Sequence, residues 1–161
     1  LQYNRLQKIQ HLEKTKCDMK EIIPEELEKY EDLFEAAGIE CEVSMEETEL
    51  INGNKELLVL VIDNYLSNAY KYTEGGRTIT VKLTKEKKGC RFVVWNEGAR
   101  LIEDDMTQIW DILSRQDKSR NREKGSTGMG LSICRRILEL HGFAYGCGNK
   151  DNGAEFWFEA K

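Results

Sequence analysis

The chain has 161 residues, of which 40% are hydrophobic, and this is enough for one domain with a single buried core. Its 24 basic and 29 acidic residues give a net charge of −5, which argues against binding to nucleic acid and against direct contact with an anionic membrane. Five cysteines without a CxxC pair indicate reduced thiols rather than a zinc site or a disulfide framework.

The first 20 residues carry a thin apolar stripe at helical spacing. Such a stripe needs a partner helix, so it predicts the end of a longer helical hairpin or coiled coil. Pro24 suits the first turn of a second helix, over residues 25–37, and Gly38 suits its C-terminal cap.

The middle of the chain mixes strand and helix patterns. Residues 39–44 alternate well enough for a strand, and residues 54–72 predict a largely buried helix that a Gly75-Gly76 turn closes. Residues 78–84 and 90–95 predict two strands joined by a lysine-rich turn.

The last third predicts a short helix over residues 104–113, a polar loop as far as residue 127 and a helix over residues 129–141. Two further strands follow within residues 145–160, around the turn signal Asp151-Asn152-Gly153. Helices and hairpin strands in this order predict an α+β fold, a two-layer sandwich with helices on one face of a mostly antiparallel sheet.

Three polar residues form a line along the predicted helix over residues 54–72. Asn64, Asn68 and Lys71 stand at positions i, i+4 and i+7. One interpretation is an ordinary solvated stripe. The other is a ligand site, because asparagine carbonyls suit Mg²⁺ and a lysine beside them suits phosphate oxygens.

A basic loop, RQDKSRNREK over residues 115–124, runs into the glycine-rich stretch GSTGMGLSI. A solvated surface loop is one interpretation. The other is a triphosphate site, because Gly125, Gly128 and Gly130 allow close backbone approach and the following helix directs its N-terminal N–H groups to the same place. The stretch lacks the lysine of a P-loop and the third glycine of a dinucleotide fingerprint.

The segment VVWNEG over residues 93–98 ends a predicted strand in a polar side chain and a glycine. It needs no function as a turn. As part of a purine pocket, Asn96 would accept a hydrogen bond from an exocyclic amine and Gly98 would make room for the base.

Taken together, these segments resemble the N, G1 and G2 boxes of the GHKL ATPase superfamily, most closely the catalytic domain of two-component sensor histidine kinases. The resemblance rests on DNYLSNAYKYT (63–73), GSTGMGLSI (125–133), ELHG (139–142) and GAEFWF (153–158), and it covers residues 20–161. It implies a Bergerat-type ATP-binding fold with ATP and Mg²⁺ as ligands.

The resemblance also implies residue roles. Asn68, with Asn64 nearby, would hold Mg²⁺, and Asn96 would recognise adenine. Lys71 and the glycine turn would meet phosphates, Tyr72 would flank the nucleotide, and residues 115–124 would form a lid. The full predicted nucleotide site is Asn64, Asn68, Lys71, Tyr72, Asn96, Gly98, Lys118, Arg120, Gly125, Thr127, Gly128, Met129, Gly130 and Leu131.

Asn64 occupies the position at which relatives that hydrolyse ATP carry a glutamate, and an amide cannot serve as a base. The resemblance therefore implies transfer of the γ-phosphoryl group to a histidine, which then passes it to a response regulator. Neither His11 nor His141 has the expected sequence context, so we expect the acceptor upstream, in a dimerisation domain. Residues 1–20 would end that domain's helical hairpin, and residues 21–161 would form the catalytic domain, on the cytoplasmic side of a membrane-anchored parent.

The sequence departs from the family pattern at four positions. Asn96 replaces an aspartate, Arg100 a glycine, Leu113 a phenylalanine and Ala154 a threonine. These departures motivate an alternative, a degenerate interaction module that binds partner domains without ATP turnover. Asn64 argues against a further alternative, an independent ATPase.

Overall fold

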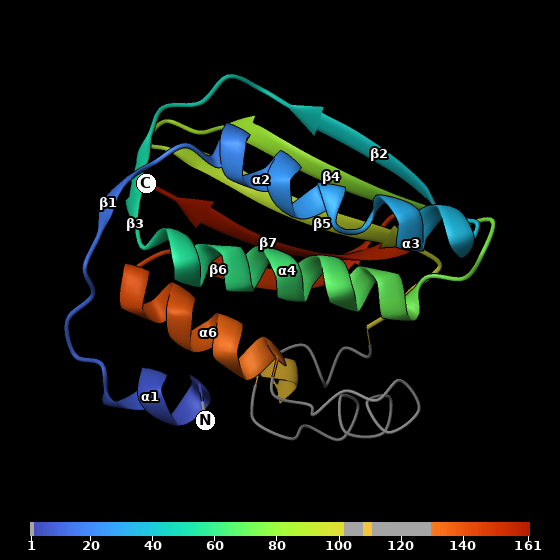
Figure 1. Cartoon of the computed structure of the whole chain (residues 1–161). Coiled ribbons are helices and arrows are strands. Elements are labelled where there is room, and N and C mark those ends of the chain that lie inside the picture. The colour runs from blue at the N-terminus through green and yellow to red at the C-terminus, as the bar shows by residue number, and fades with distance from the viewer. Residues whose placement is uncertain (1, 102–107, 111–129) are drawn as a thin grey trace.

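The computed structural model describes residues 2–101, 108–110 and 130–161. Two layers are visible, a twisted sheet and a layer of helices over one of its faces (Figure 1). The helices are α1 (Gln2–Lys8), α2 (Met19–Glu28), α3 (Glu31–Ala36), α4 (Lys55–Tyr72) and α6 (Gly130–His141), with a 3-10 turn η2 (Gln108–Trp110). The strands are β1 (Thr15–Cys17), β2 (Glu40–Met45), β3 (Ile51–Gly53), β4 (Thr78–Lys85), β5 (Cys90–Glu97), β6 (Ala144–Lys150) and β7 (Gly153–Ala160).

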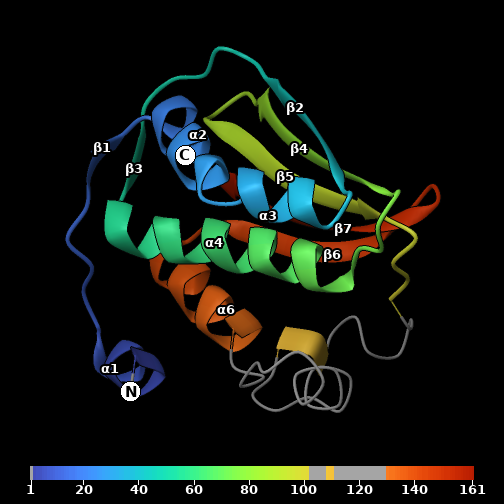
Figure 2. The same cartoon turned by 45° about the vertical axis from the view of Figure 1, so that its right-hand side comes forward.

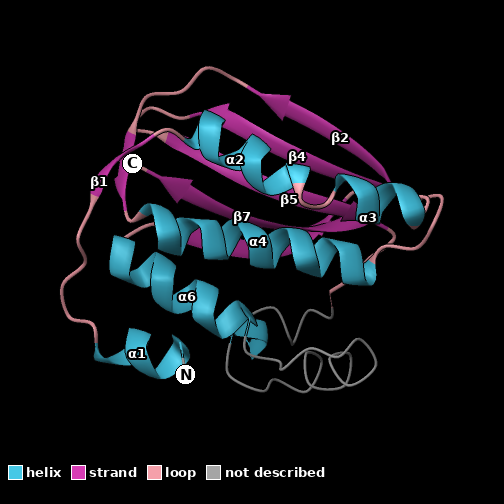
Figure 3. Ribbon diagram, in the orientation of Figure 1, coloured by secondary structure: helices cyan, strands magenta, loops and turns pink. Residues whose placement is uncertain are grey.

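The main sheet has five strands in the order β2-β4-β5-β7-β6. The β2–β4 pair is parallel and the other three pairs are antiparallel. The helices lie on one side of this sheet (Figure 3). The predicted fold class, an α+β sandwich with a mixed, mostly antiparallel sheet, is confirmed.

The core forms where alternate strand residues meet the apolar side of α4. In β4 the residues Ile79, Val81 and Leu83 are all fully buried, as period-2 alternation requires. Tyr65 of α4 lies at the centre, with its ring 6.2 Å from that of Phe92 and its hydroxyl donating to the carbonyl of Trp157 at 3.1 Å. Burial raises the pKa of Tyr65 well above its usual value. This core fixes α4 against the sheet.

Several local predictions are confirmed. The helix predicted over residues 54–72 forms as α4, and Asn54 caps it, because its side chain accepts a hydrogen bond from Leu57 N at 3.2 Å. Gly38 ends α3 with a positive φ of 72°, the C-terminal cap that glycine favours. Both predicted hairpins form, β4–β5 and β6–β7.

The prediction of one helix over residues 1–20 is wrong. Helix α1 ends at Lys8, and residues 15–17 form β1, which pairs with β3 so that Thr15 faces Gly53. Strand β3 was not predicted at all. A three-residue strand is too short to show the alternation that identifies strands in a sequence. The apolar spacing of residues 1–20 was therefore the only local signal, and it favoured a helix.

The predicted start and extent of the second helix are also wrong. Helix α2 begins at Met19, because the Asp18 carboxylate accepts a hydrogen bond from Lys20 N at 3.0 Å and caps it. Pro24 lies inside α2, and a separate helix, α3, supplies the turn before Gly38. Of the helix predicted over residues 104–113, only η2 lies within the described residues.

Candidate functional site

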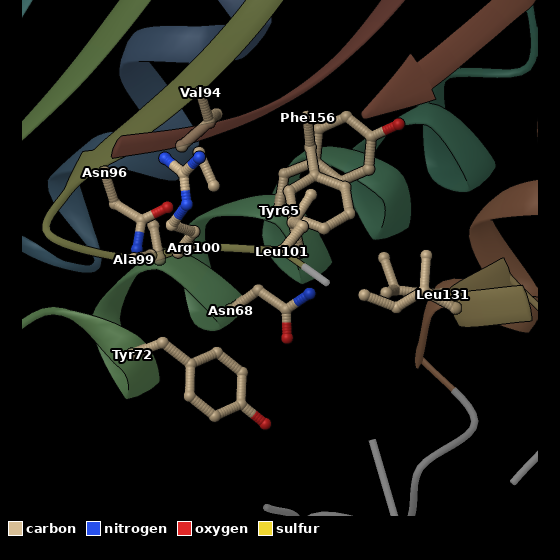
Figure 4. Close-up of a pocket in the computed structure, with 13 residues that line it drawn as sticks. Tyr65, Asn68, Tyr72, Val94, Asn96, Ala99, Arg100, Leu101, Leu131 and Phe156 are labelled. Carbon is tan, nitrogen blue, oxygen red and sulfur yellow. The ribbon is translucent and has the colours of Figure 1, made fainter. Parts of the chain in front are cut away.

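A pocket opens on the helix side of the sheet, where α4 faces β5 and β7 and where α6 begins (Figure 4). Figure 2 shows α6 beside α4 on this side of the sheet. The space that the pocket outlines is about 510 Å³, a volume that includes the solvent at its open mouth. Its lining residues are Tyr65, Asn68, Ala69, Tyr72, Val94, Asn96, Ala99, Arg100, Leu101, Ile109, Leu131, Ala154 and Phe156. An apolar cavity with a few polar side chains suits a flat, partly polar ligand.

Helix α4 supplies the polar side chains of the pocket nearest to α6. Asn68 and Tyr72 line it, and Figure 4 shows the Asn68 amide directed into the space. Asn64 lies one turn earlier, and its Nδ2 donates to the carbonyl of Leu60 at 2.8 Å. Lys71 is half-buried but does not line the pocket. Of the predicted polar line, the structure brings Asn68 alone to the cavity wall.

The start of α6 approaches α4 closely. A Cβ on Gly130, the first residue of α6, would overlap Asn64 Oδ1. Only a glycine allows this contact, so the position of Gly130 has a steric reason. The N-terminal end of α6, with its partial positive charge, therefore lies beside the amide oxygen of Asn64.

Asn96 is a buried amide at the end of β5. Only 5% of its surface is exposed, and its backbone pairs with Ile79 on one side and Ala154 on the other. Within the described residues, its side chain makes no hydrogen bond although it lines the pocket (Figure 4). The amide atoms of Asn96 reach the pocket space, so they are available to a polar ligand there.

Gly98 follows β5 in a tight turn. Its φ is +84°, its N–H donates to the carbonyl of Asn152 at 2.6 Å, and a Cβ there would lie 3.2 Å from the guanidinium of Arg77. Its neighbours Ala99 and Arg100 line the pocket, whereas Gly98 does not. The turn thus needs a glycine for its backbone conformation and for the packing of Arg77.

The start of α6 completes one wall of the cavity. Leu131, only 2% exposed, lines the pocket opposite the strands. The other predicted residues of the glycine turn and basic loop lie outside the described residues, namely Lys118, Arg120, Gly125, Thr127, Gly128 and Met129. Leu113, one of the departures from the family pattern, also lies outside them.

The apolar walls of the pocket and one polar residue behind them were not predicted from the sequence. Asn149 of β6 accepts a hydrogen bond from Leu101 N at 2.7 Å and donates one to Leu101 O at 2.8 Å. These two bonds hold the segment after β5 in place at the cavity wall. The sequence indicated only that a strand lies in this region, within residues 145–160. In the structure this strand is β7, and its alternation buries Phe156.

The two histidines have different environments. His141 is buried, its Nε2 accepts a hydrogen bond from Asn54 N at 3.0 Å, and its Nδ1–H donates to Ile137 O at 2.7 Å. Burial lowers the pKa of His141 and favours this neutral form. His11 is exposed. His141 therefore has a packing role, because its ring joins the end of α6 to the start of α4.

Across the parts of the chain that the structure describes, we find no helix both long enough and apolar enough to cross a membrane.

These features define a nucleotide-binding ATPase fold, and residues 53–161 match the family described as "Histidine kinase-, DNA gyrase B-, and HSP90-like ATPase". The chain belongs to this family. Among curated proteins it is 28% identical to the sensor histidine kinase YcbM of Bacillus subtilis over 129 residues, which are 80% of this chain and 42% of YcbM. It is also 25% identical to the signal transduction histidine-protein kinase BaeS of Escherichia coli, over 70% of this chain and 24% of BaeS. The chain thus spans less than half the length of these relatives.

Solved structures share the fold. Full-length ShkA in complex with AMPPNP superposes with a TM-score of 0.84 at 25% identity, over 99% of this chain and 33% of ShkA. The catalytic domain of the histidine kinase ThkA gives a TM-score of 0.81 at 24% identity, over 92% of this chain and 97% of that domain. The resemblance inferred from the sequence motifs is confirmed.

Proposed function

We propose that this chain binds ATP with Mg²⁺ and transfers the γ-phosphoryl group to a histidine on a dimerisation domain of the same sensor kinase. The observation that carries the proposal is the position of Asn64 and Asn68 on one side of α4, between the pocket and the start of α6. A base enclosed in the pocket would direct its phosphates toward this end of α6.

The residues present fit the metal and the phosphates chemically. Carbonyl oxygens of Asn68 and Asn64 are hard ligands of the kind that Mg²⁺ prefers. The N-terminal end of α6, where Gly130 lies against Asn64, favours an anion through its free N–H groups and its dipole. Lys71, with Lys118 and Arg120 of the predicted lid, would add cations. The AMPPNP bound to ShkA supports a triphosphate as the ligand.

Asn64 supports transfer over hydrolysis. Its neutral amide cannot remove a proton from water. The site would therefore position the γ-phosphoryl group for a nucleophile brought by another domain, and the chain's own contribution is geometry and electrostatics.

The partners follow from the same proposal. Helix α1 would belong to the end of the phosphoacceptor domain's hairpin, whereas the chain from Thr15 onward belongs to the catalytic fold, because β1 pairs with β3 and Met19 is buried in the core. The catalytic domain would lie on the cytoplasmic side of the parent protein. Arg136 of α6 supports a fixed join between α1 and the catalytic fold, because it donates to Leu6 O at 3.0 Å and Ile9 O at 2.9 Å. The phosphorylated partner would then serve a response regulator, a proposal that the solved complex of the histidine kinase ThkA with the response regulator protein TrrA supports.

The test is phosphotransfer from γ-labelled ATP to the parent protein's phosphoacceptor domain, supplied separately. We expect an acid-labile, base-stable label on that domain, reduced at least about hundredfold by Asn68→Ala, since metal positioning would be lost. A label that Asn68→Ala leaves unchanged would contradict the proposal.

One observation favours the non-catalytic alternative. Where the family pattern has an acidic residue, a glycine and a threonine, the pocket carries Asn96, Arg100 and Ala154. An interaction module without turnover would bind the phosphoacceptor domain and leave it unlabelled, with or without ATP. The labelling experiment, combined with a binding measurement between the two domains, separates the two functions.

A further inference from the structure

The part of the pocket beside β5, where a purine base would bind, contains the side-chain amide of Asn96. Among the described residues that line the pocket, Asn96 is the one amide that is less than a tenth exposed. It has no hydrogen-bond partner within the described residues, and the pocket lining described there includes no carboxylate. Whatever base enters must satisfy this amide.

A primary amide offers one acceptor and one two-hydrogen donor side by side. The base edge of adenine offers a donor, its 6-amino group, beside an acceptor, N1. The edge of a 6-oxopurine offers the reverse, the acceptor O6 beside the donor N1–H. One orientation of the Asn96 amide complements the first edge, and a half-turn about its last bond complements the second.

The surroundings of Asn96 do not fix either orientation. The residue directly across from it in β7 is Ala154, whose methyl group neither donates nor accepts. Val94, Ala99 and Leu101 add apolar lining to the same pocket, and Arg100 adds a cation. Because no described neighbour bonds to either amide atom, the half-turn breaks no hydrogen bond.

Arg100 adds a group that favours a 6-oxopurine. It is exposed and lines the pocket, on the same segment as Ala99 and Leu101. A guanidinium donates only, so it can meet O6 of a 6-oxopurine but not the 6-amino group of adenine, whereas N7 accepts in both kinds of base and gives no preference.

We infer that this site accepts 6-oxopurine nucleoside triphosphates, those of guanine and hypoxanthine, as well as ATP, and that Asn96 sets this breadth. The inference rests on the proposed function, because it assumes that a nucleoside triphosphate occupies the pocket.

Calorimetric titration of this chain with the Mg²⁺ complexes of the imido analogues of ATP, GTP and ITP tests the inference. We expect the adenosine and inosine analogues to bind within about tenfold of each other, because each leaves the amide fully bonded. Hypoxanthine and guanine present the same O6 and N1–H to Asn96, but hypoxanthine lacks the 2-amino group. The inosine analogue therefore tests these two hydrogen bonds without any steric effect of a 2-amino group. Inosine binding with weaker guanosine binding therefore supports the role of Asn96.

The matched variant is Asn96→Asp, which keeps the acceptor and removes the donor. It should weaken the inosine analogue at least about tenfold relative to the adenosine analogue, since a carboxylate repels O6. If this variant does not fold, the ratio of the dissociation constants of the adenosine and inosine analogues for the wild type still tests the inference. Adenosine binding with both 6-oxopurine analogues more than about hundredfold weaker would overturn the inference alone. Binding of none of the three would overturn the proposed function and the inference together.

Discussion

The side chain of Asn149 and the backbone of Leu101 form a reciprocal pair of hydrogen bonds, at 2.7 Å and 2.8 Å, that ties strand β6 to the segment following β5. Leu101 is buried at the pocket wall, so its N–H and C=O have little access to water. The pair therefore holds both the fold and the shape of the pocket at this point.

Replacing Asn149 with alanine should lower the free energy of unfolding by about 1–3 kcal/mol, because two partly buried backbone groups lose their partner. Denaturation in urea measures this. The control is Asn152→Ala three residues later, where the side chain is exposed and, within the described residues, makes no hydrogen bond. If both substitutions changed the free energy of unfolding equally, the two hydrogen bonds between Asn149 and Leu101 would contribute no stability of their own.

Gly130→Ala separates binding from stability. The added methyl would overlap Asn64 Oδ1 and displace that side chain from its bond to Leu60 O. Alanine is otherwise favourable in a helix, by up to about 1 kcal/mol relative to glycine. We expect nucleotide affinity to fall about tenfold or more while the melting temperature changes by only a few degrees.

A second glycine provides the control for this substitution. Gly148 of β6 has no atom within 4 Å of an added Cβ and no positive φ, so Gly148→Ala should leave nucleotide affinity unchanged. Unaltered affinity in the Gly130 variant would mean that the approach of α6 to Asn64 does not matter for binding.

His141 makes the stability of the fold depend on pH. Burial, with a smaller effect from the ammonium of Lys14, lowers the pKa of His141 below its unfolded value of about 6.5. The unfolded chain therefore takes up the proton first, so the contribution of His141 to stability is complete above about pH 6.5 and is lost as the pH falls through the folded value. Protonation would also remove the acceptor of Asn54 N.

Urea denaturation from pH 8 to pH 5 measures this dependence. We expect His141→Gln to have a shallower loss of stability over this range, and His11→Gln, a change at an exposed position, to resemble the wild type. Identical slopes for the His141 variant and the wild type would remove His141 as the cause.

Arg136 joins the N-terminal segment to the catalytic fold. Its guanidinium donates to two carbonyl groups at and just beyond the end of α1, those of Leu6 and Ile9. Arg136→Met keeps the apolar stem and removes the donors, so backbone amides of residues 5–12 should exchange with solvent about tenfold faster or more. Hydrogen exchange by mass spectrometry measures this, with the amides of β5 as the internal reference. Unchanged exchange over residues 5–12 would show that α1 is held by apolar packing alone.

Local signals predicted most of the fold. The helix over residues 55–72 carries its own cap at Asn54, and both hairpins carry turn residues between alternating strands. The polar line on α4 and Asn96 were also visible, because polar residues in apolar surroundings stand out. Each of these features depends on neighbours within a few residues of the chain.

Features that depend on distant contacts were not predictable. Strand β1 exists because it pairs with β3, more than thirty residues later, and Asn149 acts on a residue 48 positions away. Pro24 misled the prediction of α2, because the Asp18 cap sets the start of the helix and the tertiary packing tolerates a proline inside it. The apolar pocket walls likewise come from five separate elements, α4, β5, η2, α6 and β7.

The most direct test of the account is calorimetric titration of this chain with the imido analogue of ATP, with and without Mg²⁺, for the wild type and for Asn68→Ala. We expect the wild type to bind more tightly with Mg²⁺ and the variant to lose this difference, because Asn68 would supply a carbonyl ligand to the metal. Binding that does not depend on Mg²⁺, or an Asn68→Ala variant that keeps the full effect of Mg²⁺, would contradict the account.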